Sequence, residues 1–387
     1  MHDNPVVFAR CGSYDVPALT EQLKNAFSAL GAGEEFFRGK RVLLKPNLVL
    51  AKKPDQAATT HPATVGALAD VLFGFGAESV TLADSPGGPF SAAALNHVYK
   101  ICGMEGADPR VKLNDDFTFR PVTADGVKLK NLHMIAPFFN ADVIVDVCKF
   151  KSHSLTGMSC AVKNFFGLIP GLEKFEMHSA FPELPDFSEM LVDHCSLVMR
   201  EKPVLAVCDG ILSMEGNGPT HGNPVETGFL LVSRDPFALD ITAEHMMRRD
   251  GEVLYLNAAA ERGIVPRDWR QIHVLTSAGE PLPEPPTFAL AHPDADAGHF
   301  LRNLPNFMGG RFTKLFEPRP EIMKNKCVGC GKCADSCPRK TIEMVTKGKK
   351  RRARIHRDKC IRCYCCQELC PIGAVGIHQN LLIKLIH

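Results

Sequence analysis

Nine of the 15 cysteines in this 387-residue chain stand within its last 61 residues, and eight of the nine form two copies of one spacing. The spacing is Cys-x2-Cys-x2-Cys-x3-Cys, and a proline follows each copy: Pro338 after the first and Pro371 after the second. The short gaps bring three thiols onto one turn of the chain. The proline turns the chain away, so that the fourth thiol reaches elsewhere. This doubled pattern strongly constrains how the tail can fold.

The spacing is typical of bacterial ferredoxins, in which the fourth cysteine of each run binds the cluster of the other run. It therefore predicts two 4Fe–4S clusters. The first would be bound by Cys327, Cys330, Cys333 and Cys370, and the second by Cys360, Cys363, Cys366 and Cys337. Zinc and disulfide bonds are the alternatives, but zinc sites usually pair two Cys-x2-Cys units. Cys365 falls outside the spacing and is predicted to be an unligated thiol.

The tail is basic and the rest of the chain is acidic. Residues 327–387 hold 13 Lys and Arg against 4 Asp and Glu, which leaves 32 basic and 39 acidic residues in 1–326. A basic run, 347–354, lies between the two cysteine runs. Positive charge favours the reduced cluster and would attract an acidic electron-carrier protein. The alternative is a solvated hairpin tip. Nucleic acid is disfavoured as a partner, because no aromatic residues alternate with these charges.

Composition predicts a soluble globular protein, with 45% hydrophobic and 23% charged residues. No apolar run approaches the roughly 18 residues that a membrane helix needs, so no membrane partner is expected. The first residues lack the pattern of a secretory signal. Fifteen cysteines without such a signal favour a reducing cytoplasm, and exposed clusters favour an oxygen-poor cell.

Strands and helices alternate along residues 1–280. This predicts an α/β body with a largely parallel sheet flanked by helices. Strands are expected at 41–45, 79–84, 142–147, 203–208 and 228–232, and helices at 61–75, 91–103 and 237–249, the first capped by Thr60. Prolines predict a linker at 281–320. Residues 321–387 would then form a small ferredoxin-like α+β domain.

Polar residues follow these strands where each one ends. Since ligands of parallel sheets bind beyond the carboxyl ends of the strands, these residues are expected to meet at one site. The lysines among them favour a carboxylate or phosphate. The predicted ligands of an anionic small molecule are Lys45, Asn47, Lys149, Lys151 and Asn164. The alternative is that each residue only caps a turn or a helix.

The densest polar segment runs from His153 to Gly171. Thr156 and Gly157 are expected to open a helix there, with Lys163 and Asn164 about two turns along. His153 and His178 titrate in a range suited to proton transfer. Cys160 is expected to be a core residue. The candidate catalytic residues are His153, Lys163 and Asp84.

Short motifs in residues 40–250 resemble a known family. They are Lys45-Pro46-Asn47, Thr59-Thr60-His61-Pro62, Ala83-Asp84-Ser85-Pro86-Gly87-Gly88, Lys151-Ser152-His153, Thr156-Gly157-Met158, Val162-Lys163-Asn164, Asp209-Gly210-Ile211 and Gly216-Asn217-Gly218-Pro219. The chain resembles the family catalogued as domain of unknown function 362, whose members often carry a ferredoxin tail. The resemblance implies an α/β domain associated with iron–sulfur proteins. Residues 153–171 also resemble a segment of the nickel-dependent lactate racemase family.

Three functions follow as hypotheses. In the first, an oxidoreductase relays electrons through the two clusters between a carrier protein and an anionic small molecule on the body. In the second, the chain is a non-catalytic ferredoxin whose body docks a partner or assists cofactor maturation. In the third, the body is a racemase or isomerase that uses another metal cofactor.

Overall fold

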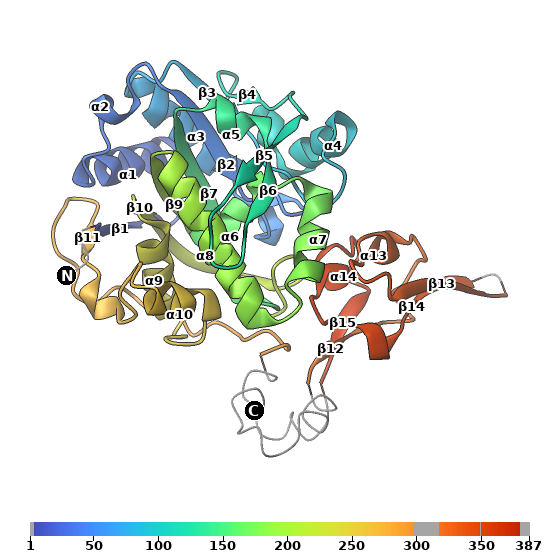
Figure 1. The fold of residues 1–387 in the computed structure, drawn as a ribbon. Helices are drawn as coiled ribbons and strands as arrows, with labels where there is room; N and C mark the ends of the chain where they lie inside the picture. The colour runs from blue at the N-terminus through green and yellow to red at the C-terminus, as the bar shows by residue number, and fades with distance from the viewer. Residues whose placement is uncertain (1–3, 297–316, 349, 380–387) are drawn as a thin grey trace.

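The computed structural model describes residues 4–296, 317–348 and 350–379. Within these ranges, a nine-stranded mixed sheet forms the centre of the body and helices cover both of its faces (Figure 1). From one edge to the other the strands are β11 (Val274–Thr276), β1 (Val6–Arg10), β10 (Asn223–Ser233), β9 (Val204–Glu215), β7 (Val143–His153), β2 (Arg41–Pro46), β3 (Ser79–Leu82) and β4 (Lys112–Leu113). The ninth strand, β8 (Gly157–Ser159), pairs with the end of β7.

The sheet is mostly parallel, which confirms the predicted fold class. The parallel pairs are β11 with β1, β9 with β7, β7 with β2, β2 with β3, and β3 with β4. β10 runs antiparallel to both β9 and β1. It does so because Asn223 pairs with Glu215 across a short connection, and a hairpin joins only antiparallel strands.

Alternate residues of the central strands face two separate cores. On β2, Val42 and Leu44 pack with one group of helices, whereas Leu43 packs with the other. Each buried side chain of this kind contributes about 1.5–3 kcal/mol of hydrophobic stabilisation. The first group contains α1 (Val16–Ala29), α3 (Pro62–Gly74) and α4 (Ala92–Cys102). The second contains α5 (Ala136–Asn140), α6 (Ala161–Asn164), α8 (Leu184–Glu201), α9 (Pro236–Met246) and α10 (Leu254–Glu261).

Shorter elements complete the body. They are α2 (Glu34–Phe37), α7 (Gly171–Ala180), the β5–β6 hairpin (Phe119–Thr123 and Asn131–Ile135), and the 3-10 turns η1 (Pro54–Gln56), η2 (Met104–Gly106), η3 (Phe165–Leu168) and η4 (Trp269–Gln271).

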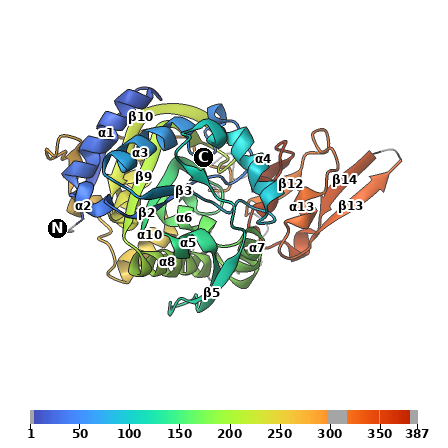
Figure 2. The same cartoon turned by 90° about the horizontal axis from the view of Figure 1, so that it is seen from above.

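In residues 317–348 and 350–379, the tail has two antiparallel strand pairs and two short helices. The pairs are β12 (Arg319–Ile322) with β15 (Val375–His378), and β13 (Ile342–Lys347) with β14 (Lys350–Ile355). The helices are α13 (Lys332–Asp335) and α14 (Cys365–Glu368), with the turn η6 (Arg357–Lys359). The β13–β14 hairpin extends away from the body (Figure 2). Half of the predicted linker, residues 297–316 of 281–320, lies outside the described residues, and β12 begins within its last two positions.

The structure corrects two local predictions. The prediction that a helix opens at Thr156 and Gly157 was wrong. β7 continues to His153, and the chain then reverses at Gly157, whose φ of 77° suits glycine, to form β8. Helix α6 begins only at Ala161, so Lys163 lies in its first turn.

The helix at 62–74 is capped by His61, not by Thr60. The His61 Nδ1 accepts a hydrogen bond from Ala63 N. The Thr60 hydroxyl instead donates to Val147 O at 2.6 Å and accepts from Asn47 N at 2.8 Å. Thr60 therefore joins the ends of β2 and β7.

Candidate functional site

A partly open cavity, whose empty space of about 630 Å³ includes open solvent, lies where the carboxyl ends of β2, β3 and β7 meet the tail. The predicted site residues that line it are Asn47, Asp84, Lys151, Lys163 and Asn164. The tail contributes Cys365, Glu368 and Leu369 from α14 and the residue after it. Figure 1 shows α14 beside α7 of the body. The cavity is therefore a site between two parts of the chain that are far apart in sequence. We call it the interdomain cavity.

Asp84, which lines the cavity, forms a buried ion pair with Lys45, which does not. The Lys45 Nζ lies 2.9 Å from Asp84 Oδ1 and donates to Pro46 O at 2.7 Å. The other Asp84 oxygen accepts a hydrogen bond from Leu48 N at 2.7 Å. The charge of Lys45 is thus directed at Asp84, and the pair fixes the end of β2 against that of β3.

The two asparagines orient the neighbouring polar groups. The Asn164 Nδ2 donates to Asp146 Oδ1 at 2.7 Å, and its Oδ1 accepts from Asn47 Nδ2 at 3.0 Å. The Asn47 Oδ1 in turn accepts from Lys151 Nζ at 2.8 Å. This chain of hydrogen bonds holds the Lys151 ammonium at the cavity.

Among the described residues, three lysines line the cavity: Lys151, Lys163 and Lys174. Lys151 donates to Asn47 Oδ1 and to Ala58 O, and Lys174 donates to Ser85 O. In the described part of the chain neither lysine forms an ion pair within 4 Å, although Asp84 and Glu368 also line the cavity and act on both charges. Burial lowers the pKa of Lys151 to about 7 and that of Lys174 to about 8. It also lowers the pKa of Lys163. A buried anion would compensate these charges.

Ser85 adds a hydrogen-bonding group to the same wall. Its side chain is fully buried and lines the cavity, and its Oγ has no hydrogen-bond partner among the described residues. A buried hydroxyl without a partner costs about 1–3 kcal/mol. An oxygen-rich ligand would remove that cost.

The histidines are less suited to proton transfer than the sequence predicts. His178 lines the cavity, but its ring stacks on Phe187 at 4.4 Å and burial lowers its pKa to about 3. His153 does not line the cavity. Its Nδ1 accepts from Leu155 N at 3.1 Å, and burial lowers its pKa well below the usual range. In this geometry His153 shapes the turn between β7 and β8.

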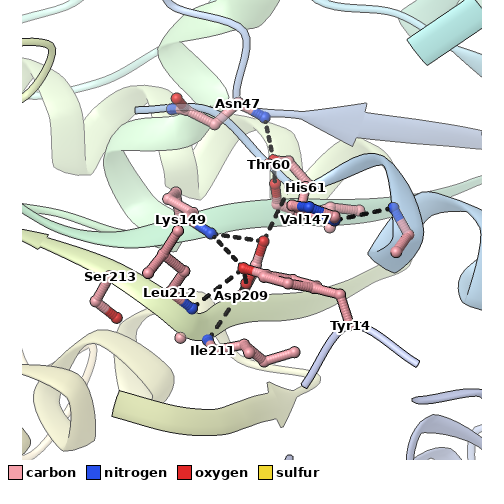
Figure 3. A network of polar contacts seen from close by, with 12 residues as sticks. Tyr14, Asn47, Thr60, His61, Val147, Lys149, Asp209, Ile211, Leu212 and Ser213 are labelled. Atoms are coloured by element: carbon pink, nitrogen blue, oxygen red, sulfur yellow. Dashed lines mark hydrogen bonds and ion pairs between the residues drawn. The ribbon is translucent and has the colours of Figure 1, made fainter. Parts of the chain in front are cut away.

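Lys149 lies in a separate network, shown in Figure 3. Its Nζ donates to Asp209 Oδ2 at 2.8 Å and to the Tyr14 hydroxyl at 2.9 Å. The Tyr14 ring stacks on His61 at 3.6 Å, and His61 N donates to Asp209. The network ties the N-terminal loop to the ends of β7 and β9, and it does not line the interdomain cavity. Tyr14 and Asp209 were not predicted as its members.

The predicted cluster ligands divide between two cavities in the tail. One cavity is lined by Cys327, Cys330, Cys333 and Cys370, and another by Cys337, Cys360, Cys363 and Cys366. We call them the first and second cysteine cavities. Burial, followed by the other three thiols of its set, raises the pKa of Cys333 to about 11. Four thiols around one cavity are the donor set that a 4Fe–4S cluster requires, so the residues fit the cofactor.

Cys365 is buried at the start of α14, and in the sequence it stands between Cys363 and Cys366, which line the second cysteine cavity. Hydrogen bonding with Cys365 lowers the pKa of the Cys363 thiol. Cys365 also lines the interdomain cavity, a position that its spacing alone did not indicate.

The tail is fixed to the body by hydrogen bonds around the same helix. The Thr220 hydroxyl donates to Glu368 O at 2.7 Å, and Gln367 Nε2 donates to Asn217 O at 3.0 Å. The His221 Nε2 lies 2.7 Å from Cys370 O. The loop at 216–220 therefore positions the tail against the body.

A second group of thiols lies in the core of the body. The Cys160 Sγ is 3.6 Å from Cys148 Sγ and 3.5 Å from Cys208 Sγ, and all three residues are buried among apolar side chains. These separations are ordinary contacts between packed sulfur atoms. Cys160 thus packs in the core, as predicted.

Together, these features define an α/β protein with a ferredoxin-type tail. Residues 320–377 match the family described as a 4Fe-4S dicluster domain, which indicates iron–sulfur electron transfer. Residues 42–244, more than half of the chain, match the family described as Domain of unknown function (DUF362), and the chain belongs to that family. This confirms the resemblance seen in the motifs.

One curated relative and two solved structures are similar to the chain. The thylakoid-associated protein sll1697 of Synechocystis sp. is 33% identical over 260 residues, which cover 66% of this chain and 78% of the relative. A protein from Thermotoga maritima has a TM-score of 0.38 at 12% identity, over 67% of this chain and 59% of its own. The lactate racemase apoprotein from Thermoanaerobacterium thermosaccharolyticum has a TM-score of 0.41 at 13% identity, over 63% and 57%. The chain thus spans less than two thirds of either solved structure.

In the described ranges, no helix combines the length and the apolar character that crossing a membrane requires.

Proposed function

We propose that the protein exchanges electrons between a carrier protein and an anionic small molecule bound in the interdomain cavity. Two 4Fe–4S clusters, one in each cysteine cavity, would supply reversible one-electron transfer. The observation that carries the proposal is the wall of lysines, Lys151, Lys163 and Lys174, facing a helix of the cluster-binding tail. A ligand there would lie within reach of both cation charge and a redox centre.

The body residues have separate roles in this proposal. Lys151, Lys163 and Lys174 neutralise the anion, and Ser85 donates a hydrogen bond to it. Asn47 and Asn164 hold Lys151 in place. Asp84 forms an ion pair with Lys45, so the charge of Lys45 is neutralised before a ligand binds. Because burial brings the pKa of Lys151 and Lys174 close to neutrality, both lysines are suited to giving a proton to a reduced ligand. Lys163 is the third candidate, and His153 acts only by shaping the adjacent turn.

The carrier would dock on the basic hairpin. A groove along β14 and β12 is lined by Lys324, Lys347, Lys350, Arg352, Arg354 and Arg357, against Glu321 and Asp358. It shares Ala353 with the first cysteine cavity and Ile355 with the second. An acidic carrier protein bound in this groove would lie close to both cavities and be attracted by long-range charge.

Binding of sulfate tests the proposal, because sulfate keeps one charge state near neutral pH. Calorimetry on anaerobically prepared protein should show binding that Lys163→Gln weakens at least tenfold, since an ion pair to a buried charge is lost. Lys24→Gln, on the exposed face of α1, is the control and should bind as the parent does. Equal binding by both variants would refute the anion site.

Metal analysis separates the two other functions. If the body is a metal-dependent isomerase, the purified protein should contain a stoichiometric metal besides iron. If the body only docks a partner, the protein needs no affinity for sulfate. Mass spectrometry of small molecules that co-purify with the anaerobic protein would identify the natural ligand.

A further inference from the structure

The interdomain cavity has an apolar wall as well as a charged one. The body supplies the aromatic rings of Phe166 in η3 and of Phe175 and His178 in α7, and the tail supplies the side chain of Leu369. Burial lowers the pKa of His178 to about 3, so this ring is uncharged at neutral pH. The lysines of the cavity therefore share its lining with uncharged rings and an aliphatic side chain.

The charged and apolar walls meet at Phe166. The centroid of its ring lies 5.9 Å from Lys163 Nζ and 6.0 Å from Lys174 Nζ. Edge-to-face contacts with His178 and Phe187, at 5.9 and 5.8 Å between centroids, fix the orientation of the ring. An anion that contacts both lysines consequently lies beside this ring. The group that the anion carries is then received by the same wall.

Phe175 is the residue of this wall that keeps a partly exposed ring. It is half-buried, whereas Phe166 and Leu369 are buried. Leu369 is held over Gly87, since a Cβ built on Gly87 would lie 2.6 Å from Leu369 Cδ2. A bare ion such as sulfate leaves the Phe175 surface in water. A ligand with an apolar body covers that surface, which favours its binding.

The charge of the lining limits the charge of the ligand. The three lysines share the cavity with Glu368 and with Asp84, whose charge is matched by Lys45. Among the described lining residues, three lysines against one carboxylate leave an excess of two positive charges when all three lysines are protonated. One or two negative charges on the ligand would be compensated. A body rich in hydroxyl groups, such as a sugar, would lose hydrogen bonds to water against the rings.

Resting on the proposed function, we infer that the ligand of the interdomain cavity is an aromatic oxyanion. It is a carboxylate, or a phosphorus oxyanion of up to two negative charges, joined directly to a flat apolar body. The oxyanion contacts the lysines and Ser85, and the body lies against Phe166 and Phe175. A flat body suits this wall because aromatic rings attract one another beyond the effect of the area that they bury.

Calorimetry on the anaerobic full chain with two matched pairs of probes tests the inference. Benzoate and acetate carry the same head group on different bodies, and so do phenylphosphonate and methylphosphonate. In each pair the aromatic member should bind at least tenfold more tightly, a ratio for which burial of about 60 Å² of apolar surface suffices. The tighter of the two aromatic probes identifies the head group as a carboxylate or a phosphorus oxyanion.

Substitutions of Phe175 locate the apolar contact. Phe175→Ala should remove most of the ratio between benzoate and acetate and leave the affinity for acetate unchanged, because the ring contacts only the body of the ligand. Phe175→Leu retains an apolar side chain and should keep part of the ratio. The control is Phe36→Ala, which removes a half-buried ring of α2 that does not line the cavity and lies away from α7 in Figures 1 and 2. It should keep the parent ratio.

The outcomes separate this inference from the proposed function. Equal affinities within both pairs would overturn the inference, and so would a Phe175→Ala variant that keeps the parent ratio. Either result leaves sulfate binding, and with it the anion site, standing. If neither sulfate nor any of the four probes bound, the proposed function itself would be refuted.

Discussion

Anion binding in the interdomain cavity should be coupled to proton uptake. Below about pH 7, Lys151 and Lys174 are both charged, and they lose their protons as the pH rises through their pKa values of about 7 and about 8. A bound dianion favours the charged form of both lysines and so raises both pKa values towards the usual 10.4. Sulfate affinity should therefore be highest at low pH and fall as the pH rises.

The magnitude follows from the two pKa values. At pH 8, Lys174 is about half protonated and Lys151 about one tenth, so full protonation on binding takes up about 1.4 protons. Because both lysines must be protonated when sulfate binds, the affinity for sulfate should fall roughly 10³-fold between pH 6 and pH 9. In the Lys174→Met variant only Lys151 gains a proton when sulfate binds, so the uptake at pH 8 should fall to about 0.9 protons.

Calorimetry in two buffers of different ionisation enthalpy measures the uptake directly. The control is Lys24→Met, which removes an exposed lysine far from the cavity lining and should leave the uptake at the parent value. If sulfate bound at pH 8 without proton uptake, the two lysines would not have the lowered pKa values described above.

Three further predictions test the remaining parts of the site. Gly167→Ala would place a Cβ 2.0 Å from Asp84 Oδ1, so it should lower the free energy of unfolding, measured by urea denaturation, by about 3 kcal/mol. The control Gly12→Ala, whose Cβ has no atom within 4 Å, should change the free energy of unfolding little. Equal effects of the two substitutions would contradict the buried ion pair. Anaerobic protein should contain about eight iron and eight sulfide, with Cys337→Ala damaging the second cluster and Cys370→Ala the first; zinc without sulfide would exclude clusters. A fourfold variant should have a lower cluster potential and be reduced more slowly by an acidic carrier, with a larger effect on the rate at low salt. It neutralises Lys350, Arg351 and Arg352 together with Lys349, which lies outside the described residues. An unchanged potential and an unchanged salt dependence would favour a merely solvated hairpin.

Local sequence determined the elements and the ligand types. The cysteine spacing predicted a ferredoxin-type tail, because three cysteines with two residues between neighbours bring their thiols together on one turn of the chain, whatever surrounds them. The alternation of strands and helices predicted the α/β body for a similar reason, since a period of two or of 3.6 residues is a local property. The polar residues at the strand ends were also visible, because the carboxyl edge of a parallel sheet follows from chain direction alone.

Tertiary structure decided which of these residues meet. Lys149 and Lys151 are two positions apart on β7, yet Lys149 pairs with Asp209 while Lys151 reaches the cavity, because the pairing of β7 with β9 changes register between them. Lys174 joins the site from α7, a helix with no motif that marks it. Cys365 joins from a segment some 200 residues further along the chain. Its role depends on how the tail docks against the body, and docking depends on the shapes of two folded surfaces, which no local spacing encodes.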